Sequence, residues 1–229
     1  NASNERPTRA ASLDAMTLGT LYHRCMELLN FAQPQANKDL ISRVIWEMDL
    51  DDAADAVALT SELDDMIAKF SAHDLWGSLA SARQIHRELD FILNVGQLTL
   101  RGQIDLLYCD AQGQWHIVDY KSDRVATDEQ IAQRASNYEL QMLAYSLAAQ
   151  RYLDQPVTDA SLYFLRPGRQ HTFATDQAKL KTASDTLAKI TETLITARRT
   201  DQFDRIESAQ CGYCQYSTLC SRLLSPQQS

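Results

Sequence analysis

Two neighbouring strand-like segments carry charged residues where an apolar strand would bury its side chains. Gln97 to Tyr108 alternates and is rich in Leu and Ile, yet contains Asp105. A glycine-containing turn follows, and the next apolar run ends with Asp119 and Lys121, two residues apart. Residues at i and i+2 on a strand point to the same face, so this carboxylate and ammonium project together. Buried charges are costly unless they are paired or bound to a metal. We therefore predict a hairpin over residues 97–120 that lays Asp105 opposite the neighbourhood of Asp119, at a site suited to a divalent cation.

An Asp-x-Lys pair alone is more often a solvated ion pair on an edge strand. Asp105 on the adjoining strand favours the site, because a surface salt bridge has no need of a second acid.

The segment after the hairpin adds a polar residue to an apolar stripe. Gln130 to Gln150 contains neither Gly nor Pro and predicts one helix, with Tyr138, Gln141 and Tyr145 on one face. A core stripe explains the tyrosines but not the glutamine, which needs hydrogen-bond partners when buried. A DNA phosphate or an active-site carboxylate could supply them.

Four motifs in this order resemble the PD-(D/E)XK nuclease superfamily and, within it, the RecB/AddA-type exonuclease domain. They are Gly19-Thr-Leu-Tyr-His23, Gly102-x-x-Asp105, Val118-Asp-Tyr-Lys-Ser122 and Tyr138-Glu-Leu-Gln141-Met-Leu-Ala-Tyr145. The resemblance runs from about Leu18 to Arg222. One position departs from the pattern, because Ile104 stands where the family often has a proline before the first acid.

The resemblance implies an α/β fold with a restriction-endonuclease-like core, a central mixed sheet flanked by helices. It also implies a metal-dependent DNA exonuclease domain of an ATP-dependent helicase–nuclease that acts in double-strand-break repair or recombination. The expected substrate is DNA, preferably single-stranded, and the expected partners are helicase domains in the same parent chain or in another subunit. Two alternatives stay open, a catalytically idle nuclease-like module that binds DNA or braces a partner, and a stand-alone endonuclease with the same core.

The predicted metal ligands are Asp105 and Asp119, whose hard oxygens suit Mg²⁺ or Mn²⁺. The resemblance adds the backbone carbonyl of Tyr120 and the side chain of His23, and an imidazole ligand tilts the preference towards Mn²⁺. Glu27, one helical turn after His23, is a weaker second candidate.

The remaining predicted catalytic residues act on the substrate. Lys121 would position the attacking water or the scissile phosphate and oppose its developing charge. Gln141, with Tyr138 or Tyr145, would orient a DNA phosphate or the lysine.

Three cysteines near the end of the chain form a second candidate metal site. Cys211, Cys214 and Cys220 have a C-x₂-C-x₅-C spacing, which suits zinc or an iron–sulfur cluster. The triplet resembles the C-terminal cysteines of iron–sulfur nucleases in this superfamily, and Cys25 is the candidate fourth ligand. Alternatively the fourth ligand lies outside this chain, or the triplet packs without metal. We expect no cluster in this fragment, and we expect Cys109 to be a core residue.

Charge and composition narrow the kind of protein further. The 229 residues are 45% hydrophobic with a net charge of −8, which fits one domain over residues 1–229 and argues against a passive nucleic-acid coat. Arg151, Arg166 and Arg169 could still form a local basic rim. No apolar run reaches membrane-spanning length and no P-loop motif occurs, so we expect a cytoplasmic domain without its own motor. Asn1-Ala2 reads as a tag remnant before an excised domain.

The remaining elements follow from apolar periodicity. We predict helices over residues 13–31 and 176–199, helical segments over 37–79, and strands over 81–94, 156–164 and 171–173.

Overall fold

The computed structural model describes residues 15–51, 53–203, 211, 214 and 216–218. Four α-helices and a 3₁₀ turn come first in the described part of the chain: α1 (Ala15–Leu28), η1 (Pro34–Asn37), α2 (Leu40–Glu47), α3 (Ala53–Ser71) and α4 (Asp74–Ala80). Three strands follow: β1 (Gln84–Val95), β2 (Leu98–Cys109) and β3 (Trp115–Lys121). The rest are α5 (Asp128–Ser136), α6 (Glu139–Leu153), β4 (Val157–Phe164), β5 (Arg169–Ala174) and α7 (Gln177–Thr200).

The five strands form one mixed sheet in the order β1-β2-β3-β4-β5. Only β3 and β4 run parallel, and α5 and α6 make the crossover between them that a parallel pair requires. The other neighbours pair antiparallel. The sequence prediction of an α/β fold with a central mixed sheet flanked by helices is confirmed.

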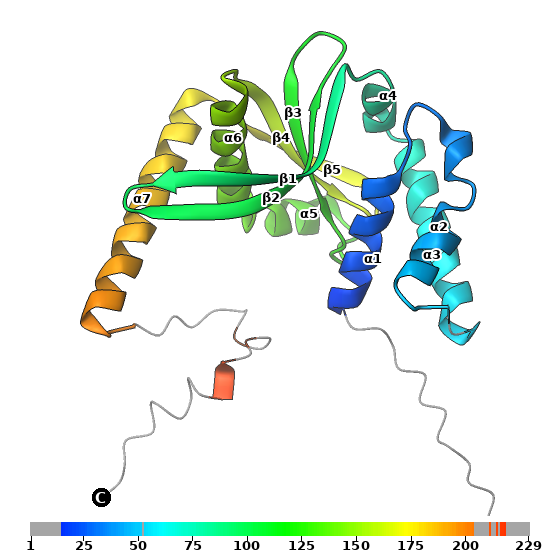
Figure 1. Ribbon diagram of the computed structural model, residues 1–229, viewed down its shortest axis with the longest axis horizontal. Helices are drawn as coiled ribbons and strands as arrows, with labels where there is room; N and C mark the ends of the chain where they lie inside the picture. Colours follow the sequence, from blue (N-terminus) through cyan, green and yellow to red (C-terminus); the bar gives the residue numbers. More distant parts are fainter. Residues whose placement is uncertain (1–14, 52, 204–210, 212–213, 215, 219–229) are drawn as a thin grey trace, which may run out of the picture.

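Two layers of helices cover the two faces of the sheet (Figure 1). Helices α1 to α4 pack against the side chains of Leu106, Tyr108, Val118 and Tyr120. Helices α5 and α6 pack against the opposite face, where Leu107 and Ile117 are fully buried. Alternate residues of β2 and β3 therefore enter different cores, as the period of two requires.

The alternation is interrupted where β1 and β2 cross the middle of the sheet. Leu106 belongs to the core beneath α1, but Ile104, two residues earlier, packs into the core beneath α6. The ladder pairs Arg87 with Leu106 and Leu89 with Ile104, and it omits Glu88 and Asp105 between them. Glu88 has a φ of +48°, a left-handed conformation that costs a non-glycine residue free energy. This break redirects two carboxylates towards His23 on α1.

The prediction of one helix over residues 130–150 is wrong, because the chain forms two helices that part at Asn137 and Tyr138. Ser136 and Asn137 are weak helix formers, and the Tyr138 N–H donates to the Ala135 carbonyl at 2.8 Å in a tight turn. Tyr138 is thus the N-cap residue of α6 rather than part of its face.

The predicted helix over residues 13–31 ends at Leu28 within the described range. The Asn30 carboxamide accepts a hydrogen bond from the Gln33 N–H, and the Asn37 carboxamide bonds both backbone groups of Asn30. Such local side-chain bonds compete with the helical ladder. The predicted helix over residues 176–199 corresponds to α7, and Asp176 caps it by accepting from the N–H groups of Ala178 and Lys179. None of the described helices has the length and apolar character needed to cross a bilayer.

Candidate active site

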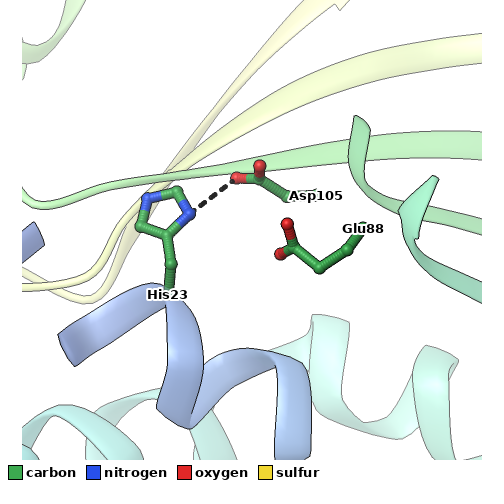
Figure 2. A group of neighbouring side chains, drawn as sticks. All are labelled: His23, Glu88 and Asp105. Carbon is green, nitrogen blue, oxygen red and sulfur yellow. Dashed lines mark ion pairs between the residues drawn. The ribbon is translucent and has the colours of Figure 1, made fainter. Parts of the chain in front are cut away.

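Side chains from four separate elements meet at the break in the β1–β2 ladder. His23 reaches up from α1 towards Asp105 on β2, and Glu88 on β1 points to the same place (Figure 2). One potential ligand atom from each of these three side chains lies within 4.8 Å of the others. Asp119 and Lys121 arrive from the neighbouring end of β3.

Asp105 connects the elements at this point. The β2–β3 ladder ends with the pair Leu106–Val118, so Asp105 and Asp119 are the next residues beyond it. The Asp105 carboxylate accepts the Tyr120 N–H at 2.8 Å and lies 3.3 Å from His23 Nδ1. The expected placement of Asp105 beside the Asp119 neighbourhood is therefore what the hairpin produces.

Asp119 is almost completely buried and lies against Lys121. Its Oδ2 is 2.7 Å from Lys121 Nζ, but the contact is poorly aligned, and this buried oxygen accepts no hydrogen bond that meets ordinary geometry. The ammonium also lies 4.3 Å from the centre of the Tyr138 ring, a cation–π distance. Tyr138 is held in turn by Asp123, which accepts from its hydroxyl at 3.4 Å and pairs with Arg134 at 2.6 Å.

Gln141 is half-buried, and it has a tyrosine hydroxyl and a carboxylate as partners. Its amide donates to the Tyr145 hydroxyl at 2.6 Å and lies 3.5 Å from Asp119 Oδ1, at the limit of a hydrogen bond. Tyr138, Gln141 and Tyr145 thus surround the Asp119–Lys121 pair in this structure. Their role towards DNA stays a prediction.

The carboxyl groups of Glu88, Asp105 and Asp119 have too little positive charge beside them to compensate three negative charges. Burial, opposed by the Tyr120 N–H and by Lys121, raises the pKa of Asp105 to about 6. Burial and the neighbouring Asp105 raise the pKa of Asp119, and burial with the same neighbour raises the pKa of Glu88 to about 7. Like charges that lie close together in a partly buried site disfavour ionisation. A cation bound among them would reverse that effect.

His23 is suited to act as a ligand rather than as a charged partner. Burial lowers the pKa of its imidazole, and this outweighs the attraction of Asp119 and a hydrogen bond to the Tyr120 backbone. A neutral imidazole keeps the lone pair that a metal needs.

These residues fit a divalent cation. The donor set is one imidazole with carboxylate oxygens, which suits Mn²⁺ and, through the oxygens, Mg²⁺. The buried Asp119 oxygen, which pairs with Lys121 but has no well-aligned hydrogen bond, is a further acceptor beside them. His23, Glu88 and Asp105 would hold the ion, with Asp119 and the Tyr120 carbonyl as the other predicted ligands.

Glu88 is the functional candidate that sequence reasoning missed. It lies seventeen residues before Asp105 in a segment that also contains Arg87 and Asp90, and charged residues of a strand usually face solvent. Only the antiparallel register brings it opposite Asp105. A glutamate in the middle of a strand, rather than near its end, was the available signal.

Glu27 and the cysteines stand apart from this cluster. The Glu27 carboxylate pairs with Arg24 at 2.7 Å. Cys25 is fully buried in the core beneath α1, and burial raises the pKa of its thiol to about 12, whereas Cys211 and Cys214 are exposed. Cys220 lies outside the described residues. A cluster on these cysteines remains a prediction, as does its absence, while Cys109 is buried in the core.

A sequence model described as the PD-(D/E)XK nuclease superfamily matches residues 2–221. The chain belongs to this superfamily. The motif positions on which the resemblance rests hold Asp105, Asp119 and Lys121 of the cluster.

Curated relatives have the same kind of domain within much longer chains. The chain is 32% identical over 192 residues to an ATP-dependent helicase/nuclease subunit of Staphylococcus epidermidis, and 29% identical over 189 residues to the subunit of the same name from Staphylococcus saprophyticus. These matches cover 73% and 74% of this chain but only 15% of each relative. The chain is thus homologous to a small part of these helicase/nuclease proteins.

The fold also has a counterpart among solved structures. A crystal structure of a predicted exonuclease from Eubacterium rectale superposes with a TM-score of 0.54 at 10% identity, over 95% of this chain and 78% of that one. At this identity the likeness concerns the fold alone.

Proposed function

We propose that this nuclease domain is a metal-dependent deoxyribonuclease that removes nucleotides from DNA ends, as the exonuclease part of an ATP-dependent helicase–nuclease. The observation that carries the proposal is the group of three incompletely compensated carboxylates, Glu88, Asp105 and Asp119, beside the buried ammonium of Lys121. A scaffold gains nothing from such a group, because unmatched buried acids lower stability.

Each residue of the cluster has a part in that proposal. His23, Glu88 and Asp105, with Asp119, would hold the cation between the two helical layers. A bound Mg²⁺ or Mn²⁺ would supply Lewis acidity and lower the pKa of a nearby water. Lys121 would stand beside the scissile phosphate and oppose the negative charge that develops on it.

The residues around the lysine keep it in place. The Tyr138 ring and Asp119 fix its ammonium from two sides. Gln141 lies against the other oxygen of Asp119 and is itself hydrogen-bonded to Tyr145, so it would help to orient the carboxylate. Correct placement of such groups is itself worth several powers of ten in rate.

The relatives support the wider setting. Their names describe an ATP-dependent helicase/nuclease, and this chain corresponds to about 15% of their length. We infer that helicase domains of the parent chain or of a partner subunit deliver the strand, and that the complex works in double-strand-break repair or recombination. The net charge of −8 agrees with a domain that grips DNA weakly by itself.

The test uses four substrates, linear and circular, each as single-stranded and as duplex DNA, with Mn²⁺ or Mg²⁺ and with a chelator. We expect degradation of linear single strands, slower loss of linear duplex, no cutting of circles, and no reaction with the chelator. Cleavage of circles would replace the exonuclease by an endonuclease. Cleavage that persists in the chelator would overturn the metal-dependent mechanism.

A further inference from the structure

Arg124 lies beside the proposed catalytic centre and has no assigned role. It lines a depression of about 440 Å³ whose wall also includes His23, Lys121 and Tyr138. A second depression, of about 540 Å³, is lined by Arg124 together with Arg166 and Arg169. The two hollows share Arg124 and Arg166, so they form one continuous surface that leads away from Lys121. We call this surface the arginine track.

The arginines of this track differ in how their charges are compensated. Arg166 pairs with Glu62 and also donates to the Tyr22 hydroxyl at 2.8 Å. Arg169 pairs with Asp128. Among the described residues, Arg124 has neither a hydrogen bond nor an ion pair, and its side chain is exposed. Arg124 is therefore the arginine of the track whose charge no acid of the described residues compensates.

The backbone on both sides of Arg124 is held in place. Asp123 is tied to Arg134 and Tyr138, and its carbonyl accepts the Val125 N–H at 3.2 Å. Val125 packs against the core beneath α5 and α6. The Ser122 carbonyl accepts a hydrogen bond from Arg166 at 3.1 Å. A free guanidinium on a fixed loop is pre-organised to receive an anion at little cost in order.

The chemistry of that anion follows from the position. A guanidinium presents a planar fork of N–H donors that matches the oxygens of a phosphate. A strand whose scissile phosphate reaches Lys121 must continue across one of the surfaces adjoining it, and the arginine track is such a surface. The acidic charge of the whole chain repels DNA elsewhere, so one uncompensated arginine at this place has a large share in attraction.

We propose that Arg124 binds a backbone phosphate of the single strand next to the scissile one, and that the arginine track guides this strand to or from the catalytic centre. The proposal rests on the proposed nuclease function and names the path of its substrate. Arg166 shapes the track and clamps its loop, whereas Arg124 makes the contact.

The test measures binding of a fluorescein-labelled oligothymidylate by anisotropy, with Mn²⁺ present and at several salt concentrations. All proteins carry Lys121→Gln, so that the strand binds without being cut. Arg124→Gln is compared with Arg101→Gln, which removes another exposed arginine, from the β1–β2 hairpin, whose tip packs near Thr191 on α7. Calorimetry of Mn²⁺ without DNA accompanies each variant.

We expect Arg124→Gln to weaken binding roughly fivefold at moderate salt and to lower the slope of log K against log salt by about 0.7, the loss of one single-strand phosphate contact. Arg101→Gln should leave both quantities unchanged, and Mn²⁺ binding should be the same in all proteins.

Equal affinities and slopes for Arg124→Gln and Arg101→Gln would overturn the track while leaving the nuclease proposal intact. A wild-type chain that neither binds nor cuts DNA would instead overturn the nuclease proposal, and the track with it. Loss of Mn²⁺ binding in Arg124→Gln would also overturn the assignment, since the residue would then act on the centre.

Discussion

Two histidine–carboxylate clusters among the described residues differ in how their charges are matched. One joins α1 to β1, β2 and β3, and the other lies at the opposite end of β3. At the end away from α1, His116 lies between two acids. Its Nδ1 is 2.9 Å from Asp159 and its Nε2 is 3.2 Å from Asp110, while the Tyr108 ring stacks on the imidazole at 5.0 Å. Asp110 also accepts the N–H groups of Gln112 and Gln114, which hold the β2–β3 turn.

The electrostatic outcome is opposite at the two ends. The Gln114 N–H and the other donors around Asp110 hold the pKa of that carboxyl below its ordinary value. Around the catalytic cluster, burial and neighbouring acids raise the pKa values of Glu88, Asp105 and Asp119. Similar residue types thus form a structural cluster with matched charges around His116, and a cluster whose negative charges are not matched around His23. The difference lies in the number of donors and in burial.

The largest effect on DNA cleavage is expected when one titratable side chain of each cluster is replaced by an amide. Asp119→Asn should lower the rate of DNA cleavage by more than roughly 100-fold, because it removes the acid that holds Lys121 and serves the cation. His116→Gln should leave cleavage unchanged. Rates with saturating Mn²⁺ on linear single strands check both, and full activity of Asp119→Asn would end the distinction between the two clusters.

A smaller loss of activity is expected when the Tyr138 ring, which contacts the Lys121 ammonium, is removed. Tyr138→Leu should lower kcat about tenfold by releasing the ammonium from its cation–π contact, with little change in KM. Tyr138→Phe keeps the ring and loses only the long bond to Asp123, so it should stay within about twofold of wild type. If the phenylalanine variant is as slow as the leucine variant, the hydroxyl rather than the ring is what matters.

Glu88→Gln should stabilise the metal-free protein. The pKa of Glu88 is raised in the folded state, so its ionisation lowers stability as the pH rises from about 4.5 towards 7. The amide removes this loss, and we expect the variant to be more stable at pH 8 by about 1 kcal/mol, discounted because solvent still reaches the side chain. The gain should vanish near pH 4.5. Urea unfolding with a chelator present checks it, and a variant less stable than wild type at pH 8 would show that the acid is already compensated.

The stability contributed by the His116 cluster should show the opposite pH dependence. Burial disfavours the imidazolium, but Asp159 and Asp110 together outweigh burial and raise the pKa of His116. Its contribution is therefore complete below about pH 6.5, the ordinary value, and is lost as the pH rises through the raised one. His116→Gln should cost about 0.5–1 kcal/mol at pH 6 and less at pH 9.

Lys181→Gln is the control for His116→Gln, because it breaks an exposed ion pair, the one with Asp185 on α7. It should leave the urea midpoint unchanged at either pH, because a fully exposed ion pair adds little to stability. A His116→Gln penalty that does not change between pH 6 and pH 9 would mean that the histidine is neutral in the fold.

The features of the site that depend on neighbouring residues along the chain could be predicted from the sequence. The hairpin, its turn and the common face of Asp119 and Lys121 follow from period and turn chemistry. Glu88 did not follow, because its link to Asp105 is made by register across a ladder and by a left-handed φ that no periodicity reports. The split of the 130–150 segment at Tyr138 was also missed, since a turn without Gly or Pro leaves little trace in the sequence.

The most direct test of the contrast is a calorimetric titration of Mn²⁺ into the wild type, Glu88→Gln and His116→Gln without DNA. We predict one site in the wild type, an unchanged site in His116→Gln and an affinity at least roughly tenfold weaker in Glu88→Gln. A wild-type chain that binds no Mn²⁺, or a Glu88→Gln variant that binds it as tightly as wild type, would contradict the claim that the acids beside His23 form the cation site.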